Sequence, residues 1–138
     1  MVDRVAILRR EHERLNAEAD RLARAAREVA QLDAAGRRLA IEDVLVFLDE
    51  QVSPHTWLDE RVLYPELRER LGDSLSAVSM NYDHLAIRRW IHDLAQADPD
   101  NVARLQELLY GLHALIVVHT WKEDELYLAA LDSRSWPS

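Results

Sequence analysis

Apolar residues recur along this chain at alternating steps of three and four positions, the spacing of one face of an α-helix. The pattern predicts four long helices, at about residues 3–31, 38–64 with an extension to 71, 74–97 and 101–131. No segment shows the strict alternation of a strand, so we expect an all-α fold. The short connections favour antiparallel neighbours. We therefore predict a single domain over residues 1–138, an antiparallel up-down-up-down four-helix bundle.

Local signals refine the ends of these helices. Pro54 lies inside the second helix and should bend it. Gly72 is a natural stop for the extension of that helix. Asp73 or Ser74 is expected to cap the third helix. The tail, residues 132–138, is expected to fray.

All but six positions on the four apolar faces are apolar. The exceptions are four histidines and two carboxylates: His12, His55, Asp59, His84, His119 and Glu123. One such histidine alone would be an ordinary core residue, but an unpaired carboxylate in an apolar core costs several kcal/mol. Counted along antiparallel helices, the four histidines fall roughly 13 to 18 Å from the same end of the bundle. Buried groups of this composition at one depth indicate a metal site.

A weak internal repeat supports two metal ions. Residues 55–60 read HTWLDE and residues 119–124 read HTWKED, while EH at 11–12 parallels DH at 83–84. Each pair of consecutive helices thus supplies one histidine from its first helix and a histidine–carboxylate pair, four residues apart, from its second. Such a pair lies on one helix face. The repeat predicts two related half-sites, and their ligands suit iron, manganese or zinc.

Composition excludes several other functions. The chain carries 17 Lys and Arg against 25 Asp and Glu, a formal net charge of −8, and shows no basic cluster for nucleic acid. It has no cysteine, which excludes disulfides, iron–sulfur clusters and thiolate catalysis. No apolar run approaches the roughly 20 residues of a membrane span. The charged start of the chain argues against a signal peptide. We expect a cytoplasmic monomer or homodimer with no membrane or nucleic-acid partner.

Taken together, these motifs resemble the hemerythrin-like, or HHE cation-binding, family, over nearly the whole chain. The resemblance is carried by EH at 11–12, HTWLDERVLYP at 55–65, DHLAIR at 83–88 and HTWKEDEL at 119–126. It implies a four-helix bundle with two non-heme iron ions, joined by an oxo or hydroxo bridge. The implied metal ligands are His12, His55, Asp59, His84, His119 and Glu123.

Two departures from the family pattern matter. Oxygen-carrying hemerythrins have His-x-x-x-His in the third helix, whereas the second position here is Arg88. His92 lies about 12 Å further along the axis than His84, too far to replace the missing histidine. Asp59 stands where the family usually has Glu and is one methylene shorter, so Glu60 is an alternative ligand.

The ligand count suggests what the centre does. Four histidines, two bridging carboxylates and a bridging oxygen would leave about two open positions on two six-coordinate irons. We expect a protein that senses or consumes O2, peroxide or nitric oxide. Whether turnover occurs is left open; an enzyme would be a di-iron oxidoreductase. The alternatives are a non-enzymatic O2 or iron binding or storage protein, and a structural bundle that holds zinc or no metal.

Other polar residues are expected to serve the surface or the surroundings of the centre. We predict that His92 and His113 are surface or interface residues. Arg88 is expected to extend into solvent, and pairing with a carboxylate near the site is the alternative. Glu60 and Asp124 are expected to be solvated or to contact the ligands from outside. Any of the tyrosines could line the entrance to the site: Tyr64, Tyr82, Tyr110 and Tyr127.

Overall fold

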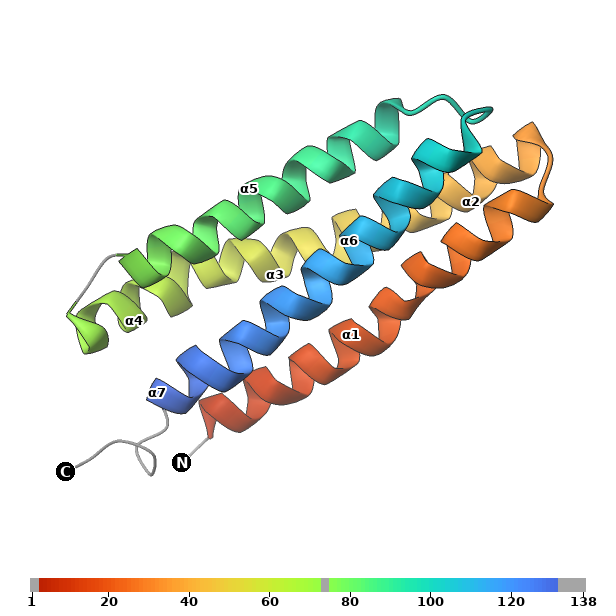
Figure 1. Ribbon diagram of the computed structural model, residues 1–138. Coiled ribbons are helices and arrows are strands. Elements are labelled where there is room, and N and C mark those ends of the chain that lie inside the picture. Colours follow the sequence, from red (N-terminus) through yellow and green to blue (C-terminus); the bar gives the residue numbers. More distant parts are fainter. Residues whose placement is uncertain (1–2, 73–74, 132–138) are drawn as a thin grey trace.

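The computed structural model describes residues 3–72 and 75–131, which are helical apart from Asp3, Gly72 and short connections at 32–33 and 97–101 (Figure 1). The first helix is α1 (Arg4–Glu28), with a 3-10 turn at Val29–Gln31. The second consists of α2 (Ala34–Phe47), α3 (Ser53–Leu58) and α4 (Tyr64–Leu71), joined by π-helical turns at Leu48–Val52 and Asp59–Leu63. The third is α5 (Leu75–Gln96). The fourth is α6 (Val102–Lys122), which continues through a π-helical turn at Glu123–Leu128 into α7 (Ala129–Leu131).

The four helices form the predicted up-down-up-down bundle. The helix α1 packs against α6 and α2, and α5 packs against α6, α2 and α4. Consecutive helices run in opposite directions, so that α1 begins and α7 ends at the same end of the bundle (Figure 1). No helix among the described residues is long and apolar enough to cross a membrane.

The helix ends follow capping chemistry. The Asp33 side chain accepts a hydrogen bond from the Gly36 backbone at 2.8 Å, so the second helix begins at Ala34, earlier than the predicted start near 38. Gly72 ends α4 as predicted, in the left-handed conformation at φ 69°. The predicted caps Asp73 and Ser74, and the tail at 132–138, lie outside the described residues.

Two of the π-helical turns lie just before a proline. Pro54 and Pro65 lack a backbone N–H, and a proline ring collides with the carbonyl four residues earlier in a regular helix. In the wider turns the bonds run over five residues instead, from Ser53 N–H to the Leu48 carbonyl and from Tyr64 N–H to the Asp59 carbonyl. The second helix therefore passes both prolines without ending.

The wider turns also shift which residues face the core. The steps of three and four positions that predict the helices place Val62 and Leu126 on the buried faces, but both are exposed. Leu63 and Leu128 are buried instead. The prediction was wrong because it applied regular α-helical spacing through two turns that contain an extra residue.

The buried apolar residues form two clusters with a polar layer between them. On each of the four helices, the polar residues of the centre lie between residues of the smaller cluster and residues of the larger cluster. Along α5, for example, Met80 belongs to the smaller cluster, His84 follows, and Ile87 belongs to the larger cluster. The smaller cluster consists of Leu63, Tyr64, Leu67, Ala77, Met80 and Leu128. The larger cluster fills the other end of the bundle.

Candidate metal centre

All six residues singled out by the sequence pattern meet in this polar layer. Five of them are 0–2% exposed, and the His55 side chain is 11% exposed. They form two groups within which one potential ligand atom of each residue lies within 4.8 Å of the others. One group is His12, His55 and Glu123, and the other is Asp59, His84 and His119.

The two carboxylates contact histidines of both groups. Asp59 Oδ2 lies 3.4 Å from Nε2 of His55, 3.5 Å from Nε2 of His84 and 3.8 Å from Nε2 of His119. Glu123 Oε1 lies 3.0 Å from Nε2 of His119, 3.7 Å from that of His55 and 3.8 Å from that of His12. Each carboxylate therefore occupies the place of a bridge between the two groups.

Several of these buried atoms lack hydrogen bonds. Nε2 of His12, Nε2 of His55 and both carboxylate oxygens of Glu123 make none. Nε2 of His119 approaches Glu123 Oε1 to 3.0 Å, but this contact does not have the geometry of a hydrogen bond. A buried unsatisfied polar atom costs about 1–3 kcal/mol. Imidazole nitrogens and carboxylate oxygens are ligands of first-row transition metals, so a bound metal ion would satisfy all of these atoms.

Comparison with known proteins identifies the family. The family model of the hemerythrin HHE cation binding domain matches residues 3–131. The chain belongs to this family. No curated protein and no solved structure matches it. Family membership and the two donor groups together make this hemerythrin domain a metal-binding protein.

Three carboxylates outside the centre orient three histidines of the hemerythrin domain. Nδ1 of His12 lies 2.6 Å from Asp124, Nδ1 of His84 lies 3.0 Å from Glu60, and Nδ1 of His119 lies 2.9 Å from Asp83. An ionised carboxylate only accepts hydrogen bonds, so each Nδ1 carries the proton and donates it. Nε2 is then the nitrogen of each ring that can offer a lone pair to a metal ion in the centre, the usual arrangement around a protein-bound metal.

Glu60 therefore lies behind His84, whereas Asp59 faces into the centre. Arg88 donates to Glu60 Oε1 at 2.9 Å, which is the pairing with a nearby carboxylate that was the alternative to solvent, and its side chain is still 48% exposed. Lys122 pairs in the same way with Asp83, the carboxylate behind His119. The sequence pattern gave no role to Asp83, because its position beside His84 lies off the apolar face. His113 pairs with Asp20, away from the centre, and His92 is exposed, as predicted for both.

Tyr64 is an additional residue of the centre. It is 1% exposed, and its hydroxyl oxygen lies 3.1 Å from Nε2 of both His84 and His119 and 3.4 Å from Asp59 Oδ2. Five residues along a regular helix turn about 140° away from the starting residue. The π-helical turn instead brings Tyr64 above Asp59, so the sequence alone could not place its hydroxyl. Burial, together with the nearby Glu123 and Asp59, raises the pKa of Tyr64 well above its usual range.

The charged groups perturb one another strongly. Burial lowers the pKa of His119, but Asp59, Asp83 and Glu123 outweigh it and raise this pKa to about 11. Burial raises the pKa of Asp83, but His119 and Lys122 overcome this effect and lower it to about 2. The carboxylates thus favour positive charge on the imidazole, which a proton or a metal cation can supply.

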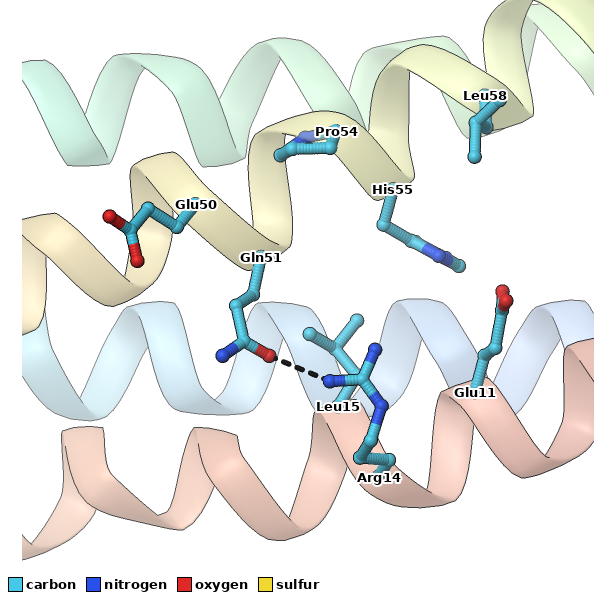
Figure 2. Close-up of a pocket in the computed structure, with 8 residues that line it drawn as sticks. All are labelled: Glu11, Arg14, Leu15, Glu50, Gln51, Pro54, His55 and Leu58. Atoms are coloured by element: carbon cyan, nitrogen blue, oxygen red, sulfur yellow. Dashed lines mark hydrogen bonds between the residues drawn. The ribbon is translucent and has the colours of Figure 1, made fainter.

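A pocket reaches the centre at His55. It has a volume of about 340 Å³ and lies between α1 and the second helix (Figure 2). Across it, Arg14 of α1 donates a hydrogen bond to Gln51 at 2.9 Å (Figure 2). Two further pockets touch Asp59 and His119, but those two side chains are only 2% exposed. His55 is therefore the most accessible of the six residues.

Proposed function

We propose that this hemerythrin domain holds two iron ions, joined by an oxo or hydroxo bridge, and that it senses or consumes O2, peroxide or nitric oxide. The observation that carries the proposal is the pair of donor groups, in each of which the carboxylate also contacts a histidine of the other group. A single ion would use one group and leave the other group's buried atoms unsatisfied.

The distances support a specific assignment of ligands. His12 and His55 would bind one ion, and His84 and His119 the other. Asp59 and Glu123 would bridge, because each contacts histidines on both sides. Glu60 was the alternative to Asp59, but it faces away from the centre and holds Nδ1 of His84. Asp59, rather than Glu60, would therefore be the second bridging carboxylate beside Glu123 in the proposed centre.

The surroundings suit redox chemistry with a small molecule. When bound, iron supplies the open coordination position and the electrons for binding or reducing an oxidant. The chain contributes ligands, their orientation and two apolar clusters that keep bulk water away from the centre. The pocket beside His55 gives a molecule the size of O2 or peroxide a route from solvent.

The proposal is tested on protein produced with added iron and purified under air. We expect about two irons per chain, near-ultraviolet bands of an oxo-bridged ferric pair, and catalytic loss of added peroxide. His119→Ala should abolish the bands and the peroxide loss. His113→Ala is the matched control on the same helix, because His113 lies outside the centre, and it should behave as the unaltered protein.

Four other results would count against the proposal. A colourless protein that carries zinc would exclude the di-iron centre. One iron per chain would exclude the shared bridges. Two irons with a reversible oxygenated spectrum and no turnover would instead indicate the non-enzymatic O2 carrier, and two irons released on reduction would indicate storage.

A further inference from the structure

The hydroxyl of Tyr64 is surrounded by metal-ligand atoms. Its oxygen lies within 3.4 Å of all three donor atoms in the group formed by Asp59, His84 and His119. The hydroxyl is deeply buried, and no other tyrosine in the part of the chain that the structure describes has a recorded contact with a residue of the centre. The arrangement places Tyr64 among the donors of this group.

We propose that Tyr64 is itself a ligand, whose phenolate oxygen binds the ion held by Asp59, His84 and His119. This inference rests on the proposed iron centre and adds a seventh residue to it. On binding, the phenol O–H bond breaks, the oxygen forms a bond to the ion, and the proton leaves to solvent. No electrons are transferred in this step.

The distances match four donors around one ion. The four atoms are separated from one another by 2.9 to 3.8 Å, the shortest separation being that between the two Nε2 atoms. Donors about 2.1 Å from a shared ion are separated by about 3.0 Å at octahedral angles and about 3.4 Å at tetrahedral angles. The phenol oxygen therefore already occupies the position of a fourth ligand.

The hydroxyl has more polar neighbours than it can donate to. Nδ1 of His84 pairs with Glu60 and Nδ1 of His119 pairs with Asp83, so Nε2 is the nitrogen of each ring that faces Tyr64. With Asp59 Oδ2 this places three polar atoms around one hydroxyl, which carries a single proton. A cation at the centre of the four atoms would satisfy all of them at once.

The proposal also determines which of the two ions keeps an open coordination position. Each ion of the proposed centre has two histidines, two bridging carboxylates and the bridging oxygen, which leaves one of about six positions. Tyr64 fills that position on the ion held by His84 and His119. The open position then belongs to the ion held by His12 and His55, and His55 lines the solvent-accessible pocket (Figure 2).

The test compares spectra of iron-loaded, air-purified protein. In the unaltered protein we expect a visible phenolate-to-iron(III) charge-transfer band, with tyrosine ring vibrations enhanced in the resonance Raman spectrum. Tyr64→Phe should lose both features and retain its iron content and near-ultraviolet oxo-bridge bands. Tyr82→Phe is the matched control, because Tyr82 is 67% exposed on α5, and it should keep every feature.

The unaltered protein alone can overturn the inference, even if Tyr64→Phe does not fold. Two irons and oxo-bridge bands without any phenolate vibration would show that the hydroxyl only donates a hydrogen bond. Phenolate features that persist in Tyr64→Phe would assign them to another residue. Failure to load iron would instead remove the proposed function, and the inference with it.

Discussion

At the scale of single residues, the centre depends on which nitrogen of each histidine faces inward. His12 shows this most simply, because Asp124 is the one partner of its Nδ1 recorded among the described residues, at 2.6 Å. The carboxylate fixes the tautomer and the ring orientation and makes Nε2 a better ligand. Loss of its charge should weaken metal binding while leaving the buried packing unchanged.

Asp124→Asn should therefore lower metal affinity by about 10- to 100-fold, the usual effect of removing such a partner. The measurement is a titration of loaded protein with a competing chelator. Asp20→Asn is the control, because it removes a carboxylate from His113, which lies outside the centre. Equal affinities in the two variants would show that Asp124 has no influence on the metal.

The sequence could reveal some residues of the centre and not others, for a physical reason. His12 or Glu123 stands out because a polar side chain on an apolar helix face breaks the pattern. Tyr64 does not stand out, because a tyrosine is acceptable on a buried face. The supporting carboxylates Glu60 and Asp124 lie at the edges of the helices, where polar residues are ordinary. Their partners are visible only once the helices are packed.

At the scale of helices, the sequence fails where the backbone departs from regular α-helix. The π-helical turns at Asp59–Leu63 and Glu123–Leu128 both begin at a proposed bridging carboxylate. Regular spacing identifies the proposed ligands up to those residues and then predicts the wrong buried positions. Pro65 gives a reason for the first turn, whereas no proline follows the second turn within the described residues, which end at Leu131.

Packing between α5 and α6 depends on a close approach at Gly111. A Cβ at this position would lie 1.7 Å from Cζ3 of Trp90. Gly111→Ala should therefore destabilise the protein by about 1–3 kcal/mol, the usual cost of overpacking, even though alanine is favoured over glycine in a helix by about 1 kcal/mol. Urea unfolding measures the difference. The same substitution in a Trp90→Leu background should cost much less, and an equal cost in both backgrounds would exclude the clash as the cause.

At the scale of the whole molecule, the bundle could be predicted because simple signals agree. Breakers divide the chain into four helices, short connections make them antiparallel, and residue counts then place four histidines at one depth. The structure confirms this arrangement. The sequence did not show that the polar layer separates two apolar clusters of unequal size, because that depends on how all four helices pack.

This division predicts how the molecule responds to metal removal. The larger cluster has many buried residues and spans all four helices, whereas the smaller consists of six residues. A ligand present at about 1,000 times its dissociation constant stabilises the fold by about 4 kcal/mol. Without metal, the polar layer holds unsatisfied and charged groups, so the end of the bundle with the smaller cluster should open first.

Amide hydrogen exchange measures this local opening. Chelation of the metal should raise exchange rates in α4 and the start of α5 far more than in α2 and the start of α6. Circular dichroism would verify that the metal-free protein remains helical. A uniform rise along all four helices would show that the protein opens as a single unit and that the two clusters have no separate stability.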